Sequence, residues 1–133
     1  TEVLNNYKSL LFDREKELLV IPVSLYEIPQ SKLDAVNDSG ITEFESDWGQ
    51  FTFQGAYVYH LSLEDGFDYQ GRITHQTEKQ MQQANEFYWY WGSSNTDITR
   101  TLFIGDVLYT ISDSMVKMND LQGLSELTSI DLS

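Results

Sequence analysis

The chain has 133 residues, of which 14% are aromatic, and this composition fits a single domain with an apolar core and excludes a disordered tail. With 21 acidic residues against 8 Lys and Arg, the net charge is −13, and a field of that sign disfavours binding to nucleic acid or to an anionic membrane surface. Cysteine is absent, which excludes disulfides, thiolate zinc sites and cysteine nucleophiles, and no apolar run approaches the ~20 residues that span a bilayer.

The first predicted elements are two strands, residues 9–13 and 18–25, on either side of a charged turn at 14–17. Residues 18–21 are apolar at every position, which is typical of a strand covered on both faces. Pro22 has no backbone N–H, so we expect a bulge or a missing ladder bond there. The polar and acidic residues 29–50 are expected to form a long loop.

A third strand is predicted over residues 51–63, because apolar and polar side chains alternate along it. The odd positions are mostly aromatic or aliphatic, so we expect the odd face to lie on the core and the even face to turn away from it. Gly55 is expected to mark a bulge or the true start of the strand. A tight turn at 64–66 then leads into a return strand at 67–74, and the only predicted helix covers residues 77–85.

The same order of elements returns in the last third of the chain. Strands are predicted at 101–104 and 107–112 around a Gly-Asp turn, and at 115–119 and 125–132 around a Gln-Gly turn. Leu11-Phe12 with residues 18–24 resembles Leu102-Phe103 with residues 107–112, and residues 58–73 resemble residues 116–130. A four-stranded unit that occurs twice predicts stacked sheets, because one sheet cannot bury both of its faces.

The expected fold class is therefore all-β, with β-propeller-type four-stranded antiparallel blades. About two blades are present, over residues 7–76 and 97–132 of a single module at 1–133, with an acidic loop at 29–50 and an aromatic connector at 77–96. Propellers contain roughly 4–8 blades, so we expect an incomplete propeller fragment that needs other blades of a longer protein or other copies of the chain. The alternative is a small β-sandwich whose hairpins are similar by coincidence.

Parts of the sequence resemble a known family. The segments TLFIGDVLYTISDS (101–114), VKMND (116–120) and LTSIDL (127–132), with KSLLFD (8–13), LLVIPVS (18–24), FQGAYV (53–58) and the RITH at 72–75, are similar to secreted bacterial and archaeal proteins that carry a C-terminal β-propeller domain distantly related to WD repeats. The resemblance implies a propeller fold and a secreted or cell-surface location. It implies no catalytic residues and no cofactor.

Two groups of residues are candidate binding sites. An aromatic platform is predicted from the run 87–91 with Trp48, because exposed Trp and Tyr rings stack on sugar rings; the alternative is a buried strand. Asp- and Glu-rich segments supply the oxygen ligands of Ca²⁺, although the acidic loop lacks the spacing of a known calcium motif, so a solvated loop is the alternative. The aromatic candidates are Trp48, Tyr88, Trp89, Tyr90 and Trp91, and the calcium candidates are Asp34, Asn37, Asp38 and Glu43.

His60 and His75 lie on adjacent predicted strands, where they would hold a metal together with Asp68; partly exposed histidines are the alternative. Known motifs for nucleophilic catalysis or nucleotide binding are absent from the sequence. We therefore expect a non-catalytic binding or structural scaffold whose partner is a cell-surface polymer or a protein. The alternatives are a carbohydrate-binding module that uses residues 87–91 and a hydrolase that is complete only in a longer protein.

Overall fold

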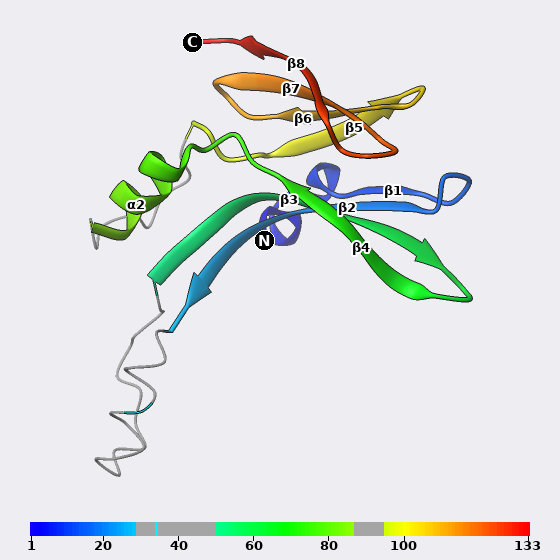
Figure 1. Cartoon of the computed structure of the whole chain (residues 1–133), viewed down its shortest axis with the longest axis horizontal. Coiled ribbons are helices and arrows are strands. Elements are labelled where there is room, and N and C mark those ends of the chain that lie inside the picture. Colours follow the sequence, from blue (N-terminus) through cyan, green and yellow to red (C-terminus); the bar gives the residue numbers. More distant parts are fainter. Residues whose placement is uncertain (29–33, 35–49, 87–94) are drawn as a thin grey trace.

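The protein forms two four-stranded antiparallel sheets, one after the other along the chain. The structure, a computed structural model, describes residues 1–28, 34, 50–86 and 95–133. The first sheet has the order β1-β2-β3-β4 and the second β5-β6-β7-β8, and Figure 1 shows the second sheet stacked over the first. Two sheets of consecutive antiparallel strands confirm the predicted all-β class and the predicted repeat.

The elements follow the predicted ones closely. After two 3₁₀ turns and four strands, a helix leads to the second set of four strands. In chain order they are η1 (Glu2–Leu4), η2 (Tyr7–Ser9), β1 (Leu11–Asp13), β2 (Leu18–Glu27), β3 (Gln50–Ser62), β4 (Gly66–Ile73), α2 (Glu78–Glu86), β5 (Arg100–Ile104), β6 (Val107–Ile111), β7 (Met115–Asp120) and β8 (Glu126–Asp131).

The two sheets share one irregularity at the same place. In the first sheet the register shifts between Val58 and Tyr59 of β3, and in the second it shifts between Met118 and Asn119 of β7. A shift of this kind adds one residue to the partner strand and increases the local twist. When the two registers are aligned at this shift, each strand residue of the second sheet has an equivalent residue in the first sheet.

This equivalence corrects one part of the predicted repeat. Ala56 pairs with Ile73 as Val116 pairs with Ile130, so the partner of Val116 in the first sheet is Ala56, and the predicted match with Val58 is wrong. The stretch from Ala56 to Ile73 is the longer one, because its hairpin contains more residues. Counting along the sequence across the hairpins therefore misaligned the third strands.

The core lies between the two sheets. On β3 it contains Ala56 and Val58, which are 0% and 1% exposed. The prediction that the odd face lies on the core is therefore wrong from Ala56 onward, whereas Phe51 and Phe53, at the start of the strand, are buried. We call the face with Ala56 and Val58 the front face of the first sheet and the face with Tyr57 and Tyr59 its back face. The core consists of Leu18, Val20, Ala56, Val58, Ile73, Ile98 and Leu108, with Leu11, Phe103, Leu121 and Leu124 packed against it.

The equivalence of the sheets extends these names to the second one. Leu108, which is equivalent to Leu19, lies on the back face of the second sheet and is fully buried in the core. The front face of the first sheet thus packs on the back face of the second. The alternating pattern predicted the strand correctly but gave the wrong core face from Ala56 onward, because both faces of β3 carry apolar side chains.

Gly55 and Pro22 do not mark irregularities, contrary to the prediction. Pro22 pairs with Ala56 and Gly55 pairs with Val23 in a continuous register. The carbonyl of Pro22 accepts a hydrogen bond from Thr1 Oγ1, so the backbone N and O of Pro22 point away from β3 and the missing N–H removes no bond between β2 and β3. Gly55 is needed for space, because a Cβ there would lie 2.2 Å from the carbonyl oxygen of Ile73.

Two glycines in the predicted turns adopt the left-handed backbone conformation. Gly66 and Gly105 have φ values of 67° and 58°, which glycine adopts without steric cost, as their places in the predicted turns require. In the part of the chain that the structure describes, no helix has the length and apolar character needed to cross a membrane.

Candidate functional site

Most of the residues singled out as binding candidates fall outside the described part of the chain. Those residues are Trp48, Tyr88, Trp89, Tyr90, Trp91, Asn37, Asp38 and Glu43. Of the calcium candidates only Asp34 is described, and it is exposed. The aromatic platform and the calcium site therefore stay predictions.

A buried polar cluster joins the two sheets. His75, in the connection that follows β4, is 5% exposed. Its ring reaches into the second sheet, where Nδ1 lies 2.8 Å from Ser112 Oγ and Nε2 lies 2.9 Å from Thr110 Oγ1. Thr110 and Ser112 are 0% and 2% exposed. We call His75, Thr110 and Ser112 the histidine latch.

The backbone around the histidine latch is held from both sheets. Thr74 Oγ1 donates a 2.6 Å hydrogen bond to the carbonyl of Gln54 on β3. From the second sheet, Lys117 Nζ donates to the carbonyl of Thr74 at 2.9 Å and lies 3.8 Å from Glu126 Oε2. The neighbouring residue, Gln76, donates from Nε2 to Asp97 Oδ1 at 3.1 Å. The connection at 74–76 is therefore anchored at each of its residues.

Gln54 forms a second bridge beside the histidine latch. Its Oε1 accepts from the backbone N–H of Ile98 at 3.1 Å, and its Nε2 lies 3.5 Å from the carbonyl of the same residue. Gln54 is 3% exposed and Ile98 is fully buried. The amide thus satisfies both backbone polar groups of a core residue just before β5 begins, which removes the cost of burying them unpaired.

The environment of His75 favours the neutral imidazole. Burial, followed by the nearby positive charge of Lys117, lowers the pKa of His75 from 6.5 to about 4. Although a serine and a histidine are in contact here, both are buried, so the pair has no room for a substrate at its oxygen. The arrangement is suited to hold two sheets together.

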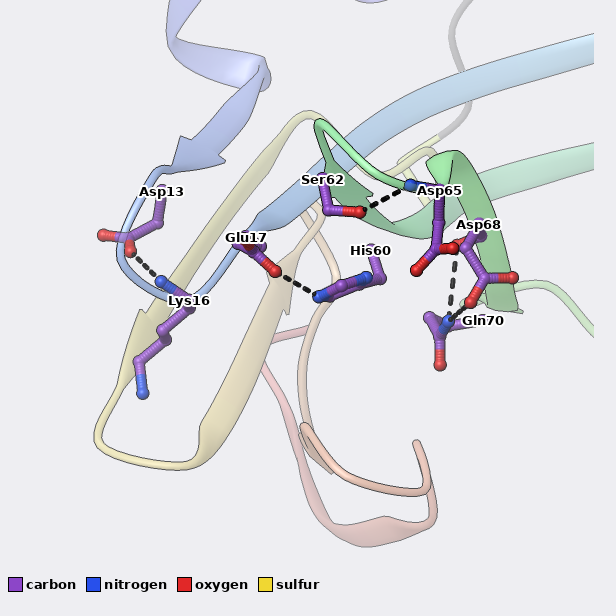
Figure 2. Close-up of polar contacts among 8 residues, drawn as sticks. All are labelled: Asp13, Lys16, Glu17, His60, Ser62, Asp65, Asp68 and Gln70. Carbon is purple, nitrogen blue, oxygen red and sulfur yellow. Dashed lines mark hydrogen bonds and ion pairs between the residues drawn. The ribbon is translucent and has the colours of Figure 1, made fainter.

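A second polar cluster lies at the hairpin ends of the first sheet (Figure 2). Glu17 Oε2, in the β1–β2 turn, lies 2.7 Å from Nε2 of His60 on β3. On the neighbouring strand the Nε2 of Gln70 donates to Asp68 Oδ2 at 3.1 Å, as Figure 2 also shows. His60 and Asp68 face each other in the strand register. Glu17, Asp68 and Gln70 are exposed and His60 is partly exposed, and the four residues form two separate bonded pairs.

The predicted metal site is not formed. His60 is bonded to Glu17, whereas His75 is bonded to Thr110 and Ser112 of the other sheet. Among the described residues, no three His, Asp, Glu or Cys side chains lie close enough to hold a metal ion. The prediction failed because His75 follows the end of β4 and reaches toward the second sheet, while His60 stays within the first.

An aromatic ladder covers the back face of the first sheet. Tyr57 and Tyr59 lie on β3, and the ring centroid of Tyr69 on β4 is 5.7 Å from each of them. Phe67 continues the ladder 6.1 Å from Tyr59, and it is 69% exposed. These rings form a partly exposed apolar surface on the side away from the second sheet.

The sequence contained signals for both features that were missed. His75 ends the RITH segment directly after an apolar strand, and Thr110 and Ser112 are the polar members of the alternating run 107–112. Buried polar groups in such positions require partners, and the partners lie on the next sheet. The aromatic ladder was visible as the odd positions of β3, but it was assigned to the core.

Comparison with known proteins gives one match. A family model described as "Beta propeller domain" matches residues 1–124 of the chain. Neither the curated proteins nor the solved structures contain a match.

Proposed function

The chain belongs to the beta propeller domain family, and from this membership we propose that it is a non-catalytic binding and structural scaffold module of an exported protein. In this proposal residues 1–133 form one module, with blades at about 7–76 and 97–132. The export and cell-surface location rest on the resemblance of segments such as 101–114 to secreted propeller proteins.

The observation that carries the scaffold function is the polar bridging between the blades. His75, Gln54 and Lys117 each bond across the gap between the first and the second sheet. Buried polar networks that are satisfied in only one geometry specify how two elements pack. The bridges therefore support a rigid two-blade unit that presents its loops and outer faces in a fixed arrangement.

The same bridges favour a non-catalytic role for the buried histidine. A general base must reach the proton that it removes within hydrogen-bond distance. Both ring nitrogens of His75 are already bonded to hydroxyls that are at least 98% buried. His75 thus supports the packing of the blades and has no free nitrogen for a substrate.

Rigidity of the two-blade unit is the property that an experiment can test. Urea unfolding is followed by far-UV circular dichroism and by tryptophan fluorescence, with His75→Asn compared against His60→Asn. We expect coincident transitions for the unmodified protein, and a shift to lower urea only for His75→Asn. Two separate transitions in the unmodified protein would show that the blades are independent, which contradicts the scaffold proposal.

The alternative function, carbohydrate binding, can be tested directly. A glycan array tests the alternative carbohydrate-binding function of residues 87–91, with Trp89→Ala and Trp91→Ala as variants and Tyr7→Ala, an exposed aromatic residue, as the matched control. Binding that is lost only in the tryptophan variants would replace the scaffold proposal by a carbohydrate-binding module. The complete reading frame tests export, because a signal peptide upstream is expected.

A further inference from the structure

The front face of the second sheet has the composition of an interblade surface, and among the described residues it is only partly buried. The six front positions that lie in or against the core in the first sheet are Leu11, Leu18, Val20, Ala56, Val58 and Ile73. Their equivalents in the second sheet are Leu102, Val107, Tyr109, Val116, Met118 and Ile130. All six are apolar, all are at least partly exposed, and Ile130 is 50% exposed.

The back face of the first sheet also has the composition of an interblade surface. In the second sheet the back positions at the core are Phe103, Leu108, Leu121 and Leu124. Their equivalents in the first sheet are Phe12, Leu19, Leu61 and Phe67. These are again apolar, and Phe12 and Phe67 are 55% and 69% exposed. Large exposed apolar surfaces of this kind mark interaction sites.

The histidine latch distinguishes the inner contact from the two outer faces. On the outer faces, apolar residues stand at the positions equivalent to all three latch residues. The residue equivalent to His75 is Leu132: His75 lies two positions beyond Ile73, and Leu132 lies two positions beyond the equivalent Ile130. The residues equivalent to Thr110 and Ser112 are Ile21 and Val23. The front face of the second sheet therefore has a leucine in place of the histidine, and the back face of the first sheet has apolar residues in place of both hydroxyls. If these two faces met, apolar side chains would pack against apolar side chains.

We propose that these two faces bind each other between copies of the chain, the front face of the second sheet of one copy packing on the back face of the first sheet of the next. Leu132 then packs against Ile21 and Val23 of the neighbouring copy, in the place that His75 occupies against Thr110 and Ser112. The contact continues the interface that already joins the two sheets within a chain.

A contact between two different faces is head-to-tail, and such contacts close into rings when the rotation permits. Propellers contain roughly 4–8 blades, so a ring built only from residues 1–133, with two sheets each, would contain about two to four copies. The net charge of −13 opposes association, and added salt screens this repulsion. We therefore expect association to increase with protein concentration and with salt.

Two blocked variants test the direction of the contact. Ile130→Glu places a charge on the front face and Phe67→Glu places one on the back face, both at positions that are at least half exposed. Gln82→Glu adds the same charge to the exposed side of α2 and is the control. In sedimentation velocity at high salt, we expect the unmodified protein and the control to associate and each blocked variant alone to lose association or stop at short oligomers.

Mixing the two blocked variants gives the sharpest readout. Each retains one functional face, so an equimolar mixture should form a one-to-one dimer and nothing larger. Association of the unmodified protein with no effect of either charge would indicate contact through sheet edges, and a dimer formed by either variant alone at full strength would indicate a symmetric contact. Either result, or a monomer under all conditions, overturns the proposal.

Exchange of the latch tests the residue pairing itself. Leu132→His alone, or Ile21→Thr with Val23→Ser alone, buries polar groups against apolar ones and should weaken association at least about tenfold. The chain that carries all three substitutions recreates the bridge between copies and should recover most of this loss at pH 7. Additive losses in the triple variant would show that these residues do not meet. Circular dichroism and the melting temperature verify that each variant is folded.

Discussion

Nε2 of His75 lies 2.9 Å from Oγ1 of Thr110, which bonds the end of one sheet to the second strand of the next. The ring is held in its neutral form, since burial lowers its pKa to about 4. Protonation would place a charge in this buried position, beside Lys117. The contact therefore links the packing of the sheets to pH.

Acid should destabilise the protein through His75. The unfolded chain takes up a proton at His75 below pH 6.5, while the folded protein does so only near pH 4, so this contribution is complete above pH 6.5 and is lost as the pH falls toward 4. We expect the free energy of unfolding to fall by about 3 kcal/mol over that window from this group, measured by urea denaturation at several pH values.

Because carboxylates also titrate near pH 4, the comparison is between the protein and its His75→Asn variant. The variant is less stable at pH 7, and the difference from the unmodified protein narrows as the pH falls. Gln82→Leu, on the exposed side of α2, is the control, because it removes no titratable group. A constant difference between the two proteins from pH 7 to 4 contradicts the prediction.

Leu108→Ala should open a cavity in the core between the sheets. Leu108 is fully buried, whereas Leu63 is fully exposed in a hairpin turn. Truncating a buried leucine costs about 2–5 kcal/mol, so thermal unfolding followed by circular dichroism should show a large decrease in Tm for Leu108→Ala. Leu63→Ala is the matched control and should change stability by less than about 0.5 kcal/mol. Equal effects of the two substitutions would place Leu108 outside the core.

Gly55→Ala should be destabilising for lack of space. The added methyl group would lie 2.2 Å from the carbonyl oxygen of Ile73 and 2.6 Å from the ring of Phe53, and forcing it in shifts the β3–β4 backbone. Overpacking costs about 1–3 kcal/mol and often more. Gly123→Ala is the control, since a Cβ there meets no atom within 4 Å and its φ is not positive. Urea midpoints measure both, and a neutral Gly55→Ala would refute the close contact.

Gln54→Leu should leave two buried backbone groups without partners. The N–H and the carbonyl of Ile98 both face the Gln54 amide, and each unpaired group costs about 1–3 kcal/mol. We expect a loss of several kcal/mol in the free energy of unfolding, together with faster hydrogen exchange at the amide of Ile98. Gln82→Leu on the exposed side of α2 is the control. Unchanged exchange at Ile98 would show that the side chain does not protect that amide.

Much of the fold followed from local pattern in the sequence. Alternation predicted the strands, and the turn glycines Gly66 and Gly105 have the positive φ values that their places require. The repeat predicted stacked sheets. From Ala56 onward, the face of β3 that lies in the core was predicted wrongly, because apolar side chains occur on both faces of this strand and the larger ones, Tyr57 and Tyr59, lie on the face away from the second sheet.

The polar contacts between the sheets were beyond the reach of sequence pattern. The bond between His75 and Thr110 joins residues that are 35 positions apart, and its formation depends on the stacking of two complete sheets. The pairing of His60 with His75 was expected from predicted strand neighbours, yet the end of β4 directs His75 to the other sheet. The aromatic run 87–91 and most of the acidic candidates fall outside the described residues, so their roles stay predictions.

The shared register shift after Val58 and Met118 has a consequence for protein engineering. A shift of this kind bends its strand and increases the local twist, so a third unit copied from either sheet would carry the same bend at the same point. Lengthening the protein by duplication would then require new connections and a choice of bridging residues, while the strands themselves stay unaltered.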